Sequence, residues 1–272
     1  MHQGFITDRE FSKTLDSCQI YPDKKSNIAL SVSGGVDSLA LLILMSRHVQ
    51  KIKSRLVILH FNHKLRKSSD KEVCEVKKIT ENLGHKFKVF TWFGKKPNSS
   101  VMELARQQRY KAMLNYCKKE SIIYLMTAHH FDDFLETYYM RSKRKHSTLG
   151  LNSIPKKYIT DSLIIYRPLI NFRKSRLIKT CKKHNINWIN DTSNKNIKFE
   201  RVKVRNFFEK NPQIYNDLEK EVKIKIKKNQ KIESKCSLFF LRNLNFFEYG
   251  VFSFPFDKFI ILTNDLKTEI LK

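Results

Sequence analysis

A six-residue segment, SGGVDS at residues 33–38, places two adjacent glycines between two apolar runs. The chain has only seven glycines in 272 residues, so the pair is unusual for this sequence. Glycines allow a tight turn and a close approach of the backbone to a phosphate, and a helix that begins directly after them points free N–H groups at an anion. The segment therefore predicts a phosphate-binding loop whose nucleotide contacts are Ser33, Gly34, Gly35, Val36, Asp37 and Ser38.

Asp37 needs a separate explanation, because a carboxylate repels a phosphate. We expect it to hold Mg²⁺ that bridges to the phosphates, while the hydroxyls of Ser33 and Ser38 add hydrogen-bond donors. The segment is not a Walker P-loop, because G-x-x-x-x-G-K-[ST] occurs nowhere in the chain. A glycine turn with incidental serines is the structural alternative.

A second group of polar residues lies in TAHHFDDFLET, residues 127–137. A strand is expected to end just before His129 and His130, which places both at a carboxyl end of a sheet, where ligands bind. Asp133 and Glu136 are three residues apart and share a helical face. Two carboxylates at one opening need a cation between them, such as a lysine ammonium or Mg²⁺. A solvated acidic face at the start of a helix is the alternative.

Further polar residues follow the second expected strand. Asn62, His63 and Arg66 come at its carboxyl end, where they would meet the adenosine and phosphates of a nucleotide. An ordinary loop between a strand and a helix is the alternative. The sequence alone does not decide between the two.

Arginines on two expected helices complete the set of candidates. Glu103 and Arg106 repeat at helical spacing with Arg109 or Tyr110, so they line one helix face. An internal ion pair explains Glu103 and Arg106 equally well, and their roles stay open. In the second half of the chain, Arg201 and Arg205 are four residues apart on an expected helix and form one positive face for phosphates of ATP or RNA.

Alternating strands and helices must position these residues. The expected strands are Asn27–Val32, Arg55–Phe61, Lys86–Trp92 and Ser121–Ala128, and the expected helices are Ser38–His48, Asp70–Leu83, Val101–Lys119 and Asp132–Arg144. Two helix starts carry possible capping boxes, Ser69-x-x-Glu72 and Ser100-x-x-Glu103. This alternation predicts an α/β fold with a parallel sheet covered by helices on both faces.

The pattern changes after about residue 150. Basic helices are expected at Lys174–His184, Arg201–Phe208 and 213–235, followed by an aromatic-rich end with short strands or a small closing element. We therefore expect a lead-in over residues 1–24, an ATP-binding catalytic domain over 25–210 and a short, mainly helical basic appendage over 211–272.

Composition narrows the possible partners. The 53 Lys and Arg residues exceed the 26 Asp and Glu residues by a net charge of +27, which favours a polyanion such as nucleic acid. A biased genome is an alternative source of so many lysines. The five cysteines lie far apart without metal-ligand spacing, so they are expected to be reduced thiols. No apolar stretch is long enough for a membrane span and no signal peptide is evident, so we expect a cytoplasmic protein.

The SGGVDS segment resembles the pyrophosphate-binding loop (PP-loop) of the N-type ATP pyrophosphatases, which cleave ATP to AMP and pyrophosphate. Five further segments are similar, in order and spacing, to those of the tRNA(Ile)-lysidine synthetases: HFNHKLRKSSDKE (60–72), MELARQQRY (102–110), TAHHFDDFLET (127–137), YRPL (166–169) and NDTSN (190–194) followed by Arg201 and Arg205. The similarity covers roughly residues 25–210. It implies an adenine nucleotide alpha hydrolase-like fold with ATP and Mg²⁺ as cofactors.

The resemblance also implies an activity. In that family ATP adenylates the C2 oxygen of the first-anticodon cytidine of tRNA(Ile) with a CAU anticodon, and the lysine ε-amine then displaces AMP. Asp37, Asp133 and Glu136 would be catalytic, and Arg109, Asp133 and Glu136 would bind lysine. The tRNA or phosphate contacts would be His129, Arg141, Arg144, Arg201 and Arg205. The oligomeric state is left open, a homodimer included.

Several residues depart from the family pattern. Lys145 and Ser147 replace glycines in RSKRKHSTLGL (141–151), Phe134 stands where glutamine is common, and Val202 stands where asparagine is common. Alternative functions are another adenylating PP-loop enzyme that modifies tRNA, such as a thiolase, or a basic RNA-binding protein that has lost its activity. Thiolation usually needs paired cysteines, and a plain RNA-binding protein has no use for carboxylates beside an anion site.

Overall fold

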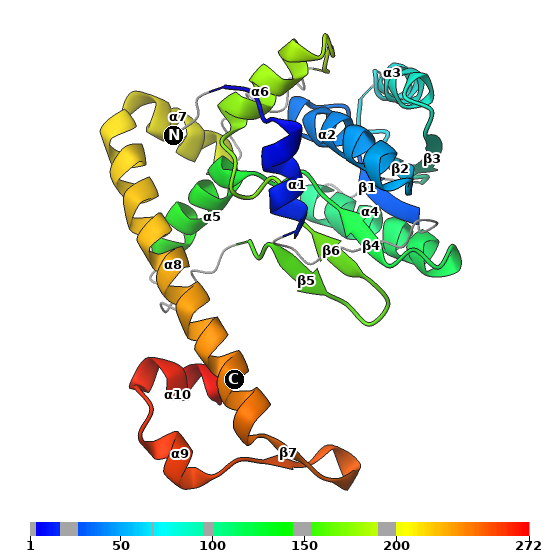
Figure 1. Cartoon of the computed structure of the whole chain (residues 1–272). Helices are drawn as coiled ribbons and strands as arrows, with labels where there is room; N and C mark the ends of the chain where they lie inside the picture. Colours follow the sequence, from blue (N-terminus) through cyan, green and yellow to red (C-terminus); the bar gives the residue numbers. More distant parts are fainter. Residues whose placement is uncertain are drawn as a thin grey trace. The chain divides into compact units, whose positions relative to one another are not determined.

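The computed structural model describes residues 4–16, 27–66, 68–94, 101–143, 154–189 and 200–271, and the chain folds into two compact units, residues 1–204 and 205–272 (Figure 1). A six-stranded sheet forms the centre of the first unit. Its strands are β1 (Asn27–Ser31), β2 (Arg55–Asn62), β3 (Lys86–Thr91), β4 (Tyr124–Met126), β5 (Lys157–Ile159) and β6 (Ile164–Tyr166).

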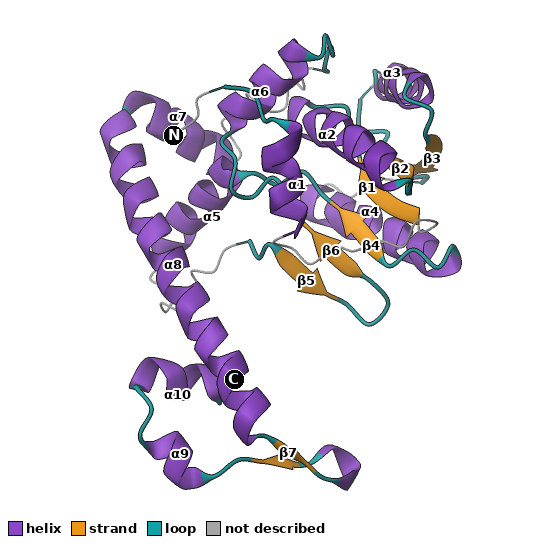
Figure 2. Ribbon diagram, in the orientation of Figure 1, coloured by secondary structure: helices purple, strands orange, loops and turns teal. Residues whose placement is uncertain are grey.

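The strand order is β3-β2-β1-β4-β6-β5, and every neighbouring pair is parallel except β5 with β6 (Figure 2). The predicted α/β fold with a parallel sheet is therefore confirmed, with one antiparallel edge strand added. The chain runs from β1 outward through β2 to β3 and then returns to place β4 on the other side of β1. Ligands of such sheets bind at the carboxyl ends of strands where the order reverses in this way, here at β1.

Helices connect these strands. They are α1 (Asp8–Asp16), α2 (Val36–Ile52), α3 (Ser69–Asn82), α4 (Val101–Lys119), α5 (Phe131–Lys143) and α6 (Lys174–Lys183), while α7 (Glu200–Lys210) spans the boundary between the units. The observed bounds lie close to the predicted ones. No helix in the described ranges is both long and apolar enough to cross a membrane.

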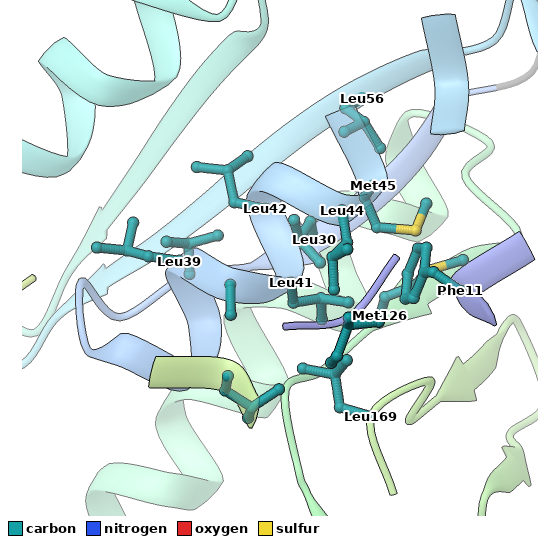
Figure 3. Close-up of a cluster of buried hydrophobic side chains, with 14 of the residues drawn as sticks. Phe11, Leu30, Leu39, Leu41, Leu42, Leu44, Met45, Leu56, Met126 and Leu169 are labelled. Atoms are coloured by element: carbon teal, nitrogen blue, oxygen red, sulfur yellow. The ribbon is translucent and has the colours of Figure 1, made fainter. Parts of the chain in front are cut away.

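The two faces of the sheet pack against different helices, because successive strand residues point to opposite sides. Ile28 and Leu30 of β1 join a core with α1, α2, α3 and α6, whereas Ala29 between them joins a core with α4 (Figure 3). Helix α2 is buried around most of its circumference, which explains why its sequence, LALLILM, is apolar without a polar stripe. These cores hold the start of α2 rigidly at the end of β1.

The capping box predicted at Ser69 and Glu72 is wrong. Helix α3 begins at Ser69, and the Ser69 hydroxyl accepts the backbone N–H of Arg66 at 3.3 Å. The Glu72 carboxylate instead accepts hydrogen bonds from the Ser68 hydroxyl and the Arg66 guanidinium, both at 2.9 Å. Hydrogen bonds to Arg66 and Ser68, just before the helix, therefore replace the reciprocal pair. Ser100 of the other expected box lies outside the described residues.

The second unit is built on one long helix, α8 (Pro212–Asn243), which begins with proline in its first turn. Its charged first half carries ion pairs four residues apart, Lys223 with Glu219 and Lys225 with Glu221. Beyond it come β7 (Asn245–Phe246), a 3-10 turn, β8 (Phe252–Ser253), α9 (Phe256–Ile260) and α10 (Asn264–Ile270). A small core of Cys236, Phe239, Leu266 and Ile270 joins α8 to α10.

Asp8 fastens α1 to α2 and supplies a test of the fold. Its carboxylate accepts hydrogen bonds from Arg47 at 2.8 Å and from Lys51 at 3.0 Å, and the Arg47 bond in particular lowers the pKa of Asp8 to about 2. Because the folded-state pKa is below the ordinary value, the ion pair contributes fully above about pH 4 and is lost as the pH falls toward about 2. We expect Asp8→Asn to lower the free energy of unfolding by about 1 kcal/mol at neutral pH.

Urea denaturation at several pH values measures this effect. The difference between wild type and Asp8→Asn should shrink as the pH falls below about 4. Asp161→Asn is the matched control, because Asp161 is exposed. A difference that stayed constant down to about pH 3 would contradict the assignment of the stabilisation to the charged carboxylate.

Candidate functional site

A cavity of about 520 Å³ opens at the carboxyl ends of β1 and β2. Its lining comes from the ends of β1 and β2 and the loops that follow them, from the first turn of α2, from α3 and α4, and from Ile189. The lining residues are Ser31, Val32, Ser33, Gly35, Asp37, His60, Phe61, Asn62, His63, Leu65, Arg66, Ser69, Glu72, Met102, Arg109, Met113 and Ile189. Seven predicted nucleotide or lysine contacts therefore meet at one cavity: Ser33, Gly35, Asp37, Asn62, His63, Arg66 and Arg109.

The Ser33–Ser38 segment, here called the glycine loop, makes the turn from β1 into α2. Gly34 has φ of 91°, a conformation that L-residues other than glycine rarely adopt. Gly35 is the residue that precedes α2 and has ordinary extended angles of −73° and 162°. The Gly34 carbonyl accepts the N–H of Ile189 at 3.0 Å, so residue 189 holds the loop from outside.

Within the glycine loop, the Ser38 hydroxyl serves the loop itself. It donates to the Gly35 carbonyl at 3.0 Å and accepts the Ser33 N–H at 3.2 Å, and the Ser38 side chain is buried. Val36 is also buried, in the core beneath the loop. Nucleotide contacts by Gly34, Val36 and Ser38 stay predictions, while Ser33, Gly35 and Asp37 line the cavity.

Asp37 faces two basic side chains. Its Oδ1 lies 3.5 Å from His130 Nε2, and its Oδ2 lies 3.8 Å from the Lys174 ammonium at the start of α6. Burial disfavours a charge on His130, yet the carboxylates of Asp132, Asp37 and Asp133 together raise the pKa of His130 to about 10. The result is a buried imidazolium that joins the first turns of α2 and α5.

Lys174 was missed by the sequence analysis, although it lies beside the predicted catalytic Asp37. Its backbone N–H donates to Asp132 Oδ2 at 2.8 Å, which fixes the start of α6 against the start of α5. The ammonium group is therefore held near the cavity by a carboxylate from another helix. Its place in a run of basic residues gave no signal, because nothing distinguishes it from its lysine neighbours in sequence.

The two carboxylates predicted on α5 are not a solvated acidic face, so that alternative is wrong. The side chain of Asp133 is 13 % exposed, and Glu136 is 3 % exposed. Asp133 Oδ2 accepts the backbone N–H of His130 at 3.2 Å. Its other close neighbour is the His130 ring, whose Nε2 lies 3.5 Å from the same oxygen. The binding of lysine by these carboxylates stays a prediction.

His129 differs sharply from His130, its neighbour in sequence. Burial lowers the pKa of His129 to about 3, and the charges of Arg167, Arg106 and Arg109 act in the same direction against that of Asp133. Its Nδ1 lies 3.0 Å from the Thr127 hydroxyl. His129 is therefore a neutral imidazole, which can form a hydrogen bond with a phosphate but supplies no positive charge to it.

The predicted residues after β2 form a connected hydrogen-bond network at the cavity wall. The Asn62 amide donates to Asp70 at 2.8 Å and accepts the N–H of Lys64 at 3.0 Å, and Arg66 donates to Glu72 at 2.9 Å. Asn62 is buried. This loop is thus held rigidly, with Arg66 and Glu72 both lining the cavity.

Arg106 and Glu103, whose roles the sequence left open, do not pair with each other in the structure. The Glu103 carboxylate accepts from Gln107 at 3.4 Å, while the Arg106 guanidinium lies 5.0 Å from the centre of the Tyr110 ring. Arg109 lies 5.6 Å from the same ring and also lines the cavity. The face of α4 that carries these arginines therefore adjoins the cavity.

The other predicted arginines lie on α5 and α7 or outside the described residues. Arg141 lies in the last turn of α5, and Arg201 on α7 donates to the Thr137 hydroxyl of α5 at 3.0 Å. Arg205 lies on α7 as expected but belongs to the second unit. Arg144 is outside the described residues, so its predicted contact is not placed.

Two departures from the family pattern have a structural role, and two cannot be placed. Phe134 stacks against Phe131 with parallel rings 6.5 Å apart, and Val202 is 6 % exposed. Both positions thus serve packing in this chain. Lys145 and Ser147 fall in a segment that the structure does not describe.

Comparison with known proteins decides the family. A family model of the PP-loop domain, an ATP-binding domain, matches residues 6–211. The chain belongs to the PP-loop domain family. The matched range includes the glycine loop, and ATP is the nucleotide that this domain uses.

Two curated relatives of this PP-loop chain carry the same name. A tRNA(Ile)-lysidine synthase of Wolbachia pipientis is 37 % identical over 198 residues, which are 72 % of this chain and 45 % of the relative. A tRNA(Ile)-lysidine synthase of Rickettsia bellii is 31 % identical over 248 residues, which are 90 % of this chain and 57 % of the relative. The PP-loop chain thus spans about half the length of the curated relatives it matches.

A solved structure supports the fold alone. The U34-tRNA thiolase of Methanococcus maripaludis, solved with its [4Fe-4S] cluster, is 17 % identical to this PP-loop chain with a TM-score of 0.64. The similarity covers 79 % of this chain and 78 % of the thiolase. The PP-loop fold is therefore shared, while the chemistry of the thiolase says nothing about this chain.

Proposed function

We propose that this chain is the catalytic part of a tRNA(Ile)-lysidine synthase. It would bind ATP in the cavity at the PP-loop and transfer AMP to the C2 oxygen of the first-anticodon cytidine of tRNA(Ile) with a CAU anticodon. In that step the oxygen bonds to the α-phosphorus and pyrophosphate leaves. The lysine ε-amine would then bond to C2, lose a proton and release AMP, which gives lysidine and decoding of AUA as isoleucine.

One observation carries the proposal. The cavity at the carboxyl end of β1 is lined by the glycine loop, whose Gly34 has a positive φ, and by Asp37 at the start of α2. The Lys174 ammonium lies 3.8 Å from the Asp37 carboxylate. Backbone N–H groups at a helix start bind phosphates without further charge, and a lysine beside them stabilises negative charge that develops on a leaving pyrophosphate. The identity of 31 % to 37 % with curated lysidine synthases supports the particular reaction.

The lysine substrate would extend from the cavity toward α5, whose Asp133 and Glu136 do not themselves line the cavity. Asp133 and Glu136 are nearly buried carboxylates, and a buried carboxylate stabilises an ammonium group strongly because little water screens it. Arg109 supplies the opposite charge from α4 and adjoins the cavity. We therefore assign Asp37, Asp133 and Glu136 to catalysis, and Arg109 to the lysine carboxylate, through a two-pronged hydrogen bond.

Mg²⁺ fits this site as an ion shared with the nucleotide. The described residues contain no group of three His, Cys, Asp or Glu side chains placed to hold a metal. Mg²⁺ is commonly bound by one or two carboxylates together with substrate phosphates, and the Asp37 carboxylate lines the cavity where those phosphates would lie. When bound there, Mg²⁺ would neutralise part of the phosphate charge.

The RNA partner is supported by charge. The net charge of +27 attracts the phosphates of tRNA, and Arg141, Arg144, Arg201 and Arg205 lie in or near the basic second half of the chain. We assign the catalytic domain to residues 25–210 and the basic appendage to 211–272, as the sequence predicts. We place the reaction in the cytoplasm, where its tRNA substrate is found.

A thiolase activity is not favoured by the described cysteines. Cys117, Cys181 and Cys236 are buried and Cys74 is exposed, and none of the four forms a disulfide or a metal-binding group. Burial raises the pKa of both Cys117 and Cys181 to about 12, which keeps these thiols protonated and unreactive at neutral pH.

Transfer of labelled lysine to RNA tests the proposal. The full chain is incubated with labelled lysine, unmodified tRNA(Ile) with a CAU anticodon, and ATP with Mg²⁺. We expect label in the RNA only when ATP is present, with AMP and pyrophosphate formed in equal amounts to the label. A methionine tRNA with the same CAU anticodon is the control for selection of the RNA. Label that appears without ATP, or no label with any RNA, would refute the assignment.

A further inference from the structure

A cluster of four side chains lies beside the cavity, where β4 and β6 end. It consists of Arg106, Arg109 and Tyr110 of α4 and Arg167, which directly follows β6, and we call it the arginine cluster. The guanidinium carbons of Arg106 and Arg109 lie 5.0 Å and 5.6 Å from the centre of the Tyr110 ring. Because Arg109 also lines the cavity, the cluster adjoins the proposed reaction site.

The positive charge of the arginine cluster is not balanced within the protein. In the ranges that the structure describes, no carboxylate oxygen lies within 4.0 Å of the nitrogens of Arg106, Arg109 or Arg167. Arg167 is only 7 % exposed, and its Nη1 donates to the Pro155 carbonyl at 2.7 Å. Arg106 is exposed and Arg109 is half-buried, whereas Arg167 is buried. A buried guanidinium without a counter-charge is costly to fold, so Arg167 indicates a negative group that arrives from outside the protein.

Two polar atoms of the cluster point to the same conclusion. The Tyr110 hydroxyl and Arg167 Nε are buried, and neither forms a hydrogen bond of ordinary geometry among the described residues. The two side chains lie close together, because burial lowers the pKa of Arg167 and the Tyr110 hydroxyl acts on that pKa in the opposite direction. Both can donate a hydrogen bond, and buried donors are normally satisfied. A ligand that accepts hydrogen bonds from both atoms would satisfy them together.

Charges of both signs act on His129. Besides burial, the charges of Arg167, Arg106 and Arg109 lower its pKa, and that of Asp133 raises it. Positive groups and a carboxylate that both lie close enough to act on one side chain suit a molecule that carries a negative and a positive group.

We propose that Arg106, Arg109, Arg167 and Tyr110 form an oxyanion-binding site that holds the negatively charged group of a substrate. The inference rests on the proposed function and extends it from Arg109 alone to Arg106, Arg167 and Tyr110. Guanidinium groups match carboxylate and phosphate oxygens with paired hydrogen bonds. Two substrates of the proposed reaction carry such a group: lysine has an α-carboxylate, and the RNA has phosphodiesters.

Binding of L-lysine and of cadaverine, which has both amines but no carboxylate, tests the site. Both ligands are titrated calorimetrically into the full chain as wild type, Tyr110→Phe and Arg167→Gln. We expect each variant to bind L-lysine about tenfold or more weakly, because a charge-assisted hydrogen bond is lost, while cadaverine binding stays unchanged. Arg55→Gln is the matched control, since Arg55 is an exposed arginine at the start of β2.

The salt dependence of tRNA binding distinguishes the second source of the oxyanion. If both variants keep the preference for L-lysine and Arg167→Gln, which removes a charge, reduces the slope of log K against log salt by about one, the oxyanion is an RNA phosphate. The site is refuted if neither the preference nor the slope changes, or if L-lysine and cadaverine weaken equally.

Separate control measurements test whether each variant is folded and whether the result depends on lysidine formation. Circular dichroism establishes whether each variant is folded, and Tyr110→Phe removes a single oxygen, so it decides the question should Arg167→Gln fail to fold. None of these measurements requires lysidine formation. If the wild type forms no lysidine, the proposed reaction is refuted. If Tyr110→Phe nevertheless loses the preference for L-lysine that the wild type shows, the oxyanion-binding site is still supported.

Discussion

Gly34→Ala is expected to slow the reaction by about a hundredfold and to destabilise the protein, whereas Gly35→Ala is expected to leave the stability unchanged. The difference arises from the backbone. Gly34 has φ of 91°, and a Cβ there would lie 2.6 Å from Ile189 Cδ1 and 3.0 Å from Val76 Cγ2. Gly35 has φ of −73°, and a Cβ there would lie no closer than 3.8 Å to another residue.

The expected magnitudes follow from these contacts. A non-glycine residue in the left-handed region costs about 1–2 kcal/mol, and the loop must also shift to separate the new methyl group from its neighbours. A displacement of about 1 Å in a group that positions a substrate lowers the rate by about a hundredfold. Gly35→Ala should keep its unfolding free energy within about 0.5 kcal/mol of wild type, although its methyl group would face the nucleotide.

Thermal unfolding without nucleotide and the rate of lysine transfer measure the two effects. A third variant, Gly34→Ala with Ile189→Val, removes the Cδ1 atom and so separates the steric contact from the backbone strain. We expect it to recover only part of the lost stability, since the strain at residue 34 remains. Equal unfolding temperatures for Gly34→Ala and Gly35→Ala would contradict this account.

Ile189 also illustrates what the sequence could not predict. The glycine pair predicted a phosphate-binding turn, because few residues other than glycine adopt a left-handed backbone conformation. The residue that holds this turn lies 155 positions away, and its hydrogen bond to Gly34 is a backbone contact with no preference for a side-chain type. Long-range backbone contacts of this kind leave no pattern in a single sequence.

Some strands could be predicted from the sequence and others could not. The strand β1 was predicted to within one residue, because its apolar run is bounded by polar residues and followed by glycine. The strands β5 and β6 were missed, since each has only three residues and neither is long enough to show a period of two. The strand expected over Ser121–Ala128 is shorter in the structure, where Ser121 has a positive φ of 52° that ends α4 rather than starting a strand.

Some residues of the candidate site could likewise be predicted from the sequence, and others could not. Residues in the glycine loop and directly after β2 were found because they follow strand ends, where ligands of parallel sheets bind. The burial of Asp133 and Glu136 could not be predicted from the sequence. Helical spacing shows that the two residues share a helix face, but it does not show which part of the protein packs against that face. Lys174 was missed because its importance comes from one tertiary contact, with Asp37 of another helix.

Lys174→Met is expected to lower the turnover rate by about 100-fold to 1,000-fold at saturating ATP, lysine and tRNA. The ammonium lies 3.8 Å from Oδ2 of Asp37, and Asp37 lines the cavity in which we propose that the phosphates of ATP bind. Removal of one well-placed group that stabilises transition-state charge costs about that factor in other enzymes. Stability should change little, since the Lys174 side chain is 36 % exposed and its ion pair with Asp37 is long.

Lys182→Met is the matched control, because Lys182 is an exposed lysine in the last turn of the same helix. Both variants lose one positive charge from α6, so a general weakening of tRNA binding would affect them equally. Only a specific role beside the phosphates makes the turnover of Lys174→Met fall far below that of Lys182→Met. Lys174→Arg should recover part of the rate, since it keeps the charge but presents it as a wider, planar group. Equal turnover rates in the two methionine variants would remove Lys174 from the catalytic site and leave it as one more part of the basic surface.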